Sequence, residues 1–113
     1  MHEMSLAEGI VQLVEDAARA EGGSKVKAVW LEVGQLSGTE TEAIRFCFDV
    51  VARDTMLDGA RLEIVETAGQ GWCLGCGQSV ALEQRYAPCP QCGGYQVEPT
   101  GGLETRVKEF LLE

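Results

Sequence analysis

The sequence predicts an α+β fold in which two helices pack on a roughly three-stranded mixed sheet that carries an inserted four-cysteine, zinc-ribbon-like lobe. Two segments have apolar residues at helical spacing, and three show the alternation of half-buried strands. Two glycine-rich joints flank the segment that holds four of the five cysteines. With 113 residues, the chain has the length of one domain with one modest core.

The first helix is expected to begin near Ser5 and to stop at Gly22 and Gly23. Ser5 and Glu8 fit a capping box, in which the serine caps the helix and the glutamate reaches back. Glycine commonly follows the last helical residue. The apolar residues of this segment form one predicted stripe: Leu6, Ile10, Leu13, Val14, Ala17 and Ala18.

Residues 25–36 are expected to form the first strand, and residues 40–53 the second helix. Thr39 and Glu42 fit a second capping box ahead of that helix. In the strand, Val29, Leu31 and Val33 alternate with Ala28, Trp30 and Glu32. The predicted second helix has a wide apolar stripe, which predicts deep burial against a sheet. The stripe consists of Ala43, Phe46, Cys47 and Val50, widened by Ile44, Phe48 and Val51.

Residues 60–66 and 103–113 are expected to be the other two strands of the sheet. The alternation breaks at the end of the last strand, which predicts a bulge or an edge position. Glycine joints on both sides of the cysteine segment suggest that this segment is an insertion. We therefore expect one α/β domain of residues 1–68 plus 101–113 and a cysteine-containing lobe of residues 69–100.

The cysteine spacing is the strongest chemical signal: Cys73 and Cys76 form one Cys-x-x-Cys pair, and Cys89 and Cys92 form another after twelve residues. Paired thiolates of this kind at this separation are typical of zinc sites. The alternatives are two disulfides or a redox pair. Disulfides are disfavoured because no secretory leader is visible, and a redox pair would not need to be duplicated. Four thiolates fill a tetrahedron, so we expect a structural zinc ion and no catalysis at it.

The charge of the chain disfavours the usual partner of zinc ribbons. The formal net charge is −9, and four thiolates with one divalent cation lower it to about −11. Between Cys73 and Cys92 the only basic residue is Arg85, whereas nucleic-acid binding depends on neutralising phosphates with Lys and Arg. We expect proteins or cations as partners, and neither nucleic acid nor membrane. With five cysteines and no visible leader, we expect a cytoplasmic protein.

The N-terminus offers a second set of metal ligands. His2 is the only histidine. The Met1 amine, the His2 amide and the His2 imidazole can close adjacent chelate rings around Ni(II) or Cu(II). The Glu3 amide supplies a fourth nitrogen, or its carboxylate an oxygen. From the residues alone, a mobile terminus without metal remains the more common case.

An enzyme is not expected, because a single histidine, at the terminus, leaves no set of acid, base and nucleophile. Cys47, the fifth cysteine, fits a buried apolar residue.

Four stretches in order along the chain resemble the HypA/HybF family of nickel-incorporation proteins: the opening residues 1–5, the segments 33–38 and 58–64, and the two cysteine pairs. The resemblance implies a nickel metallochaperone that binds Ni(II) at Met1, His2 and Glu3. It implies delivery to the large subunit of NiFe-hydrogenase, with the GTPase HypB as partner. It also implies Zn(II) at Cys73, Cys76, Cys89 and Cys92.

Two other functions fit parts of the sequence. A zinc-ribbon module that binds nucleic acid would use the cysteine segment, and it requires a basic face. A zinc-stabilised protein-interaction adaptor would have an inert N-terminus. For the nickel metallochaperone, we expect a monomer or weak dimer.

Overall fold

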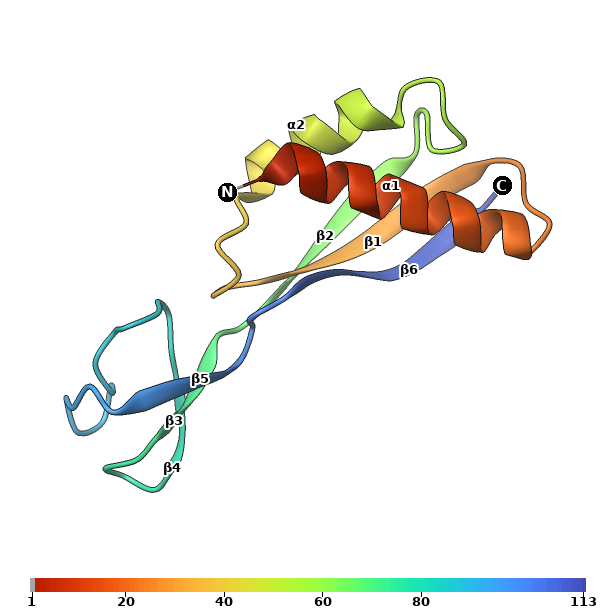
Figure 1. Cartoon of the computed structure of the whole chain (residues 1–113). Helices are drawn as coiled ribbons and strands as arrows, with labels where there is room; N and C mark the ends of the chain where they lie inside the picture. Colours follow the sequence, from red (N-terminus) through yellow and green to blue (C-terminus); the bar gives the residue numbers. More distant parts are fainter. Residues whose placement is uncertain (1) are drawn as a thin grey trace. The chain divides into compact units, whose positions relative to one another are not determined.

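A computed structural model describes residues 2–113, which form two compact units. The first unit consists of the described residues through Glu32, Thr39–Val65 and Arg106–Glu113, and the second of Val33–Gly38 and Glu66–Thr105. Figure 1 shows the order of elements, with α1, α2, β1, β2 and β6 in one group and β3, β4 and β5 in the other. The independent domains predicted at residues 1–68 plus 101–113 and 69–100 stay a prediction.

Helix α1 spans Glu3–Ala20, so it begins earlier than predicted. His2 precedes it, and the Leu6 N–H donates to the His2 carbonyl over 2.9 Å. The capping box predicted at Ser5 and Glu8 is therefore wrong, because both residues lie inside the helix. No glycine or proline interrupts residues 1–5, and a glutamate in the first turn is favoured by the helix dipole.

The predicted stop of α1 at the glycines is confirmed. Gly22 has a φ of 78°, in the left-handed region. The Gly23 N–H donates to the Ala18 carbonyl over 2.8 Å, and the Gly22 N–H donates to the Arg19 carbonyl over 3.0 Å. These two bonds form a Schellman motif, which satisfies carbonyl groups that the helix end leaves without partners.

The buried stripe of α1 differs from the prediction at Leu13, whose side chain is 56% exposed. The stripe follows spacings of three and four residues, and Leu13 falls outside the arc that these positions define. Its members are Ala7, Ile10, Val11, Val14 and Ala18.

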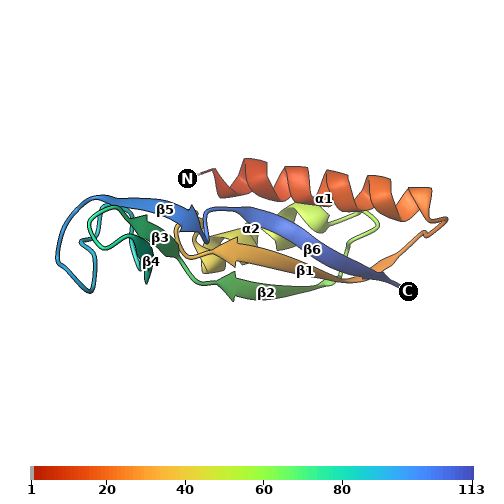
Figure 2. The same cartoon turned by 90° about the horizontal axis from the view of Figure 1, so that it is seen from below.

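Three strands form the sheet that the helices cover: β1 (Val26–Gly34), β2 (Arg61–Thr67) and β6 (Thr105–Leu112), in the order β2-β1-β6. β1 and β2 run in the same direction, and β6 runs the opposite way (Figures 1 and 2). The predicted mixed sheet is confirmed. As expected, β6 is an edge strand, and its burial alternation breaks at Lys108 and Glu109, which are both exposed.

Helix α2 (Thr41–Ala52) connects β1 to β2 and lies beside α1. Its buried residues are Ile44, Phe48 and Ala52. Phe46 was expected in the buried stripe, but it is 67% exposed because it lies two residues from Ile44 and from Phe48, on the opposite side of the helix. Within residues 2–113, no helix is both long and apolar enough to cross a membrane.

The capping box predicted at Thr39 and Glu42 is also wrong. Glu40 is the N-cap of α2, in extended conformation, and its own side chain makes no capping hydrogen bond. The Ile44 N–H donates to the Glu40 carbonyl over 2.9 Å, which sets the first helical turn. The acceptor for the Glu40 N–H comes from another helix, because the Glu3 carboxylate lies 3.2 Å from it.

The second unit contains a sheet that the sequence did not predict. It has the order β4-β3-β5, with β3 at Gln70–Cys73, β4 at Gln78–Ala81 and β5 at Val97–Gly101, and both pairs are antiparallel. Strands of four or five residues next to glycines are too short to show a clear alternation. The lobe predicted as a ribbon-like insertion therefore has regular structure of its own.

The segment Val33–Gly38 belongs to this second unit. The Leu36 N–H donates to the Gly102 carbonyl over 2.7 Å, and the Gln35 side chain accepts from the Gly69 N–H over 2.8 Å. Arg85 donates from Nε to the Leu36 carbonyl over 3.0 Å. The backbone of this loop is thus held by both glycine joints and by the one basic residue between the cysteine pairs.

Candidate metal sites

The four cysteines of the predicted zinc site lie together in the second unit. Cys73 is the last residue of β3 and Cys76 lies in the turn to β4, whereas Cys89 and Cys92 lie in the loop before β5. The Sγ atoms of Cys73 and Cys92 are 3.7 Å apart, and those of Cys76 and Cys89 are 3.8 Å apart. All four sulfur atoms lie within 4.8 Å of one another. The topology therefore brings both pairs to one point.

Each cysteine pair is built on the same backbone turn. The Gly77 N–H donates to the Cys73 carbonyl over 2.8 Å, and the Gly93 N–H donates to the Cys89 carbonyl over 2.9 Å. Gly77 and Gly93 have φ values of 66° and 75°. Glycine adopts this left-handed conformation at little cost. The repeated Cys-x-x-Cys-Gly pattern thus directs both sulfurs of each pair inward.

Backbone N–H groups also point at the sulfurs. The Cys92 and Gln91 N–H groups lie 3.5 and 3.4 Å from Cys89 Sγ, and the Cys76 N–H lies 3.4 Å from Cys73 Sγ. Hydrogen bonds from the amides of Cys92 and Gln91 lower the pKa of the Cys89 thiol to about 7. Hydrogen bonds with the Cys92 and Cys73 side chains raise the pKa of Cys76 to about 12. The cluster is therefore prepared for negative charge, but it cannot hold four thiolates without a cation.

The donor set fits a tetrahedral metal ion. A zinc–sulfur distance of about 2.3 Å places the sulfurs of a tetrahedron about 3.8 Å apart. The observed separations of 3.7 and 3.8 Å match this spacing. All four thiols are free, and a disulfide needs a sulfur–sulfur distance of about 2.05 Å. The alternative of two disulfides does not describe this structure, and the cluster can hold a metal ion.

The apolar core around the cluster is small. Cys73, Cys89 and Val80 are buried together, and Cys76 and Val97 pack against them while partly exposed. Most of these residues are the candidate ligands themselves. A core of this size cannot offset the chain entropy of ordering the surrounding loops, so a bound ion would contribute much of the stability of the cluster.

The described residues of the predicted N-terminal site, His2 and Glu3, lie at the start of α1. Met1 lies outside the described residues, and His2 is exposed. The first N–H groups of a helix have no acceptor within the helix, so the amides of His2 and Glu3 are not tied into α1. The Glu3 carboxylate, by contrast, accepts from the Glu40 N–H. The Glu3 amide thus has no intrahelical acceptor, whereas one oxygen of the Glu3 carboxylate has a donor.

Sequence reasoning missed the partners that hold these sites in place. Nothing in the sequence pairs Glu3 with Glu40, which is distant along the chain. Arg85 was noted only for its charge, but it donates to the loop that contains Leu36. Arg85 is the only basic residue between the two cysteine pairs, and this was the one feature of the sequence that could have indicated its structural role.

Comparisons with known proteins agree with this arrangement. The profile of the family described as hydrogenase/urease nickel incorporation, metallochaperone, hypA, matches residues 1–112. The "Hydrogenase maturation factor HypA" proteins of Albidiferax ferrireducens and Azotobacter chroococcum are each 58% identical over 113 residues, which is 100% of this chain and 100% of each relative.

A solved structure supports the fold. The solution structure of the Ni metallochaperone HypA from Helicobacter pylori is 23% identical, with a TM-score of 0.71, over 99% of this chain and 97% of that one. The family description is that of a metallochaperone, which agrees with the expectation that the chain is not an enzyme. The chain belongs to the HypA family, the nickel-incorporation metallochaperones of hydrogenase and urease maturation.

Proposed function

We propose that this metallochaperone holds Ni(II) at its N-terminus and passes it to the large subunit of NiFe-hydrogenase. The ligands are the Met1 amine, the amide and imidazole nitrogens of His2, and the Glu3 amide. The observation that carries the proposal is the position of His2, the only histidine, which is exposed immediately before the first helical residue. Four nitrogens in this order suit the tetragonal geometry that Ni(II) prefers.

The start of α1 suits a site that must release its metal. The His2 and Glu3 amides need not break a helical hydrogen bond when they bind nickel. The His2 carbonyl, however, accepts from Leu6 and so fixes the backbone on the other side of the site. The ligands thus lie on a short segment attached to a stable helix, open to solvent and to a receiving protein.

The four cysteines are proposed to bind a structural zinc ion. Cys73, Cys76, Cys89 and Cys92 offer four sulfurs within 4.8 Å of one another, two pairs of them at tetrahedral spacing, and four sulfur ligands leave no position for water or substrate. The binding free energy of such a site contributes directly to folding. Nickel and zinc therefore have separate roles, one as cargo and the other as part of the fold.

The partners and compartment follow from the same chemistry. We propose that HypB supplies or gates nickel at the N-terminus, and that the chain acts as a monomer or weak dimer. The formal charge of −9 favours protein partners over nucleic acid. Four free thiols at ligand spacing require a reducing compartment, which supports a cytoplasmic location.

The experiment is to extend the chain by a glycine and a serine before Met1, which removes the free amine next to His2 and leaves every native side chain in place. The extended protein should lose stoichiometric nickel binding by calorimetry, while it keeps its zinc. Unchanged nickel binding would count against the amine as a ligand. A simultaneous loss of zinc would show that the extension had disturbed the fold.

A further inference from the structure

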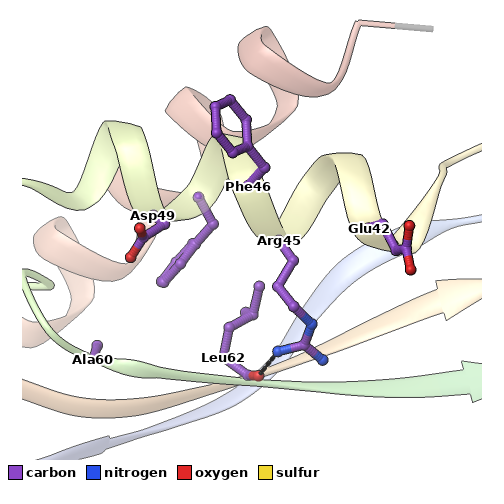
Figure 3. Close-up of a pocket in the computed structure, with 7 residues that line it drawn as sticks. Glu42, Arg45, Phe46, Asp49, Ala60 and Leu62 are labelled. Carbon is purple, nitrogen blue, oxygen red and sulfur yellow. Dashed lines mark hydrogen bonds between the residues drawn. The ribbon is translucent and has the colours of Figure 1, made fainter.

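A groove of about 440 Å³ lies between α2 and β2, away from both candidate metal sites along the chain. Figure 3 shows Arg45 pointing from α2 toward β2, with Glu42 and Asp49 on either side of it along the helix and Phe46 pointing away from the strand. Apolar side chains of Phe48, Ala60 and Leu62 complete the lining. The groove thus combines an apolar floor with charged walls.

One wall of the groove is the free edge of the sheet. β2 pairs only with β1 and is the outer strand on this side. In a strand, the N–H and C=O groups of one residue face the same side of the strand, and those of the next residue face the opposite side. Thr67 faces β1, because its carbonyl accepts from the Gln35 N–H over 2.9 Å. Leu62, Ile64 and Glu66 each lie an odd number of residues from Thr67, so their backbone groups face away from β1. The Leu62 carbonyl agrees with this direction, because it accepts from Arg45.

Arg45 covers this edge with a single contact. Its Nη1 donates to the Leu62 carbonyl over 2.7 Å. Native sheets protect open edges with charged side chains, and an arginine on a helix is a cover that can move aside. The outward backbone groups of Leu62, Ile64 and Glu66 then offer the hydrogen-bonding row that an added strand requires.

The charges beside the edge indicate what kind of strand would fit. Glu42 and Asp49 are exposed, and neither forms an ion pair within residues 2–113. They lie on the same face of α2 as Arg45. When Arg45 leaves Leu62, the two carboxylates face the side chains of any strand added below them. With a chain charge of −9, the complementary occupant is cationic.

We propose that an extended, cationic segment of a partner protein binds as a fourth strand at the β2 edge, with its Lys or Arg side chains between Glu42 and Asp49. Arg45 leaves the Leu62 carbonyl as the segment enters. A second copy of this chain is a poor occupant, because it carries the same net charge of −9. The inference does not depend on the nickel or zinc assignment.

The test uses the zinc-loaded full chain and a short capped peptide of alternating lysine and valine. Amide signals of Leu62, Ile64 and Glu66 should shift on titration, and their hydrogen exchange should slow. Two control peptides distinguish the causes. A lysine–valine peptide that is N-methylated at every residue keeps the charge but cannot donate hydrogen bonds to the edge, and a glutamate–valine peptide keeps the strand tendency but reverses the charge. Neither should bind.

Variants complete the test. Glu42→Gln combined with Asp49→Asn should weaken peptide binding about tenfold, as expected for two partly exposed ion pairs. Glu8→Gln combined with Glu109→Gln removes the same charge elsewhere and should leave binding unchanged. Arg45→Ala should strengthen binding, because the Leu62 carbonyl is then free. Thermal unfolding of each variant shows whether the fold is intact.

Three outcomes would overturn the proposal. Equal binding of the N-methylated peptide would show general attraction to an acidic protein. Shifts confined to residues outside α2 and β2 would place the site elsewhere. Concentration-dependent dimerisation that the peptide abolishes would show that a second copy occupies the edge.

Discussion

The Glu3 carboxylate accepts a hydrogen bond from the Glu40 backbone N–H over 3.2 Å, and so links the first residue of α1 to the N-cap of α2. In a capping box, a glutamate within the same helix would accept from that N–H. Here the acceptor comes from a neighbouring helix. The Glu3 side chain therefore has a structural partner next to the proposed nickel site, whereas its amide, at the first position of α1, has no acceptor within the helix.

Replacing Glu3 separates these two roles. Glu3→Ala should keep one nickel per chain, because the amide ligand remains. It should lower the free energy of unfolding by about 1 kcal/mol, the usual net value of one hydrogen bond. Calorimetry with Ni(II) and urea unfolding of the zinc-loaded chain measure the two effects.

Glu3→Gln is the matched control, since its side-chain oxygen can still accept from the Glu40 N–H. It should recover part of the stability lost in Glu3→Ala and bind nickel normally. If both variants lost nickel, the carboxylate would be a ligand, and the assignment of the Glu3 amide would be wrong.

The glycines that follow each cysteine pair are expected to be required for their backbone conformation alone. Gly77 has a φ of 66°, and a Cβ there would meet nothing within 4 Å. Gly77→Ala should therefore lower the free energy of unfolding by about 1–2 kcal/mol through strain. Gly75→Ala is the control, because its Cβ would lie 3.8 Å from the Cys73 and Cys92 sulfurs at normal contact distance. Equal stability of the two variants in urea would contradict this account.

Zinc retention should fall as the pH is lowered. Cys76, with a pKa raised to about 12, holds its proton until a metal displaces it, so zinc binding releases a proton throughout the neutral range. Cys89, with a pKa lowered to about 7, is ionised above that pH and becomes protonated below it. The zinc affinity should therefore fall more steeply with decreasing pH below pH 7, by about a further tenfold per pH unit for each additional proton.

Competition with a chelator at a series of pH values checks this prediction. The fraction of zinc removed at fixed chelator concentration, corrected for protonation of the chelator, should rise steadily toward acid. A zinc affinity that did not change with pH would mean that the four sulfurs are not the ligands.

The sequence predicted the parts of the fold that depend on long periodic segments. The helices, the three strands of the main sheet and the edge position of β6 could be identified because apolar spacing reports burial directly. The stop of α1 at Gly22 followed from local backbone chemistry. The fold class was therefore accessible without coordinates.

Helix starts and exposed faces could not be predicted in the same way. Both capping boxes failed. Ser5 and Glu8 lie inside α1, and the acceptor for the Glu40 N–H lies on α1 and leaves no local pattern. Phe46 and Leu13 were placed inside by their hydrophobicity, yet both are mostly exposed. Their exposure depends on where neighbouring elements lie, and only tertiary structure provides that information.

The candidate sites show the same contrast. The cysteine spacing predicted the cluster of Cys73, Cys76, Cys89 and Cys92, because each pair carries its own turn and glycine. The small β4-β3-β5 sheet that joins the pairs was missed, since its strands are too short to show a period. The groove beside Arg45 was also missed, because it depends on how α2 packs against β2, which only tertiary structure shows.

The most direct measurement is quantitation of nickel and zinc by elemental analysis in untagged wild-type protein and in His2→Ala, after exposure to both metals and gel filtration. We expect one nickel and one zinc in the wild type, since each proposed site takes one ion. In His2→Ala, zinc should remain and nickel should be absent. Nickel retained by His2→Ala, or zinc lost with it, would contradict the separation of a terminal cargo site from a structural four-cysteine site.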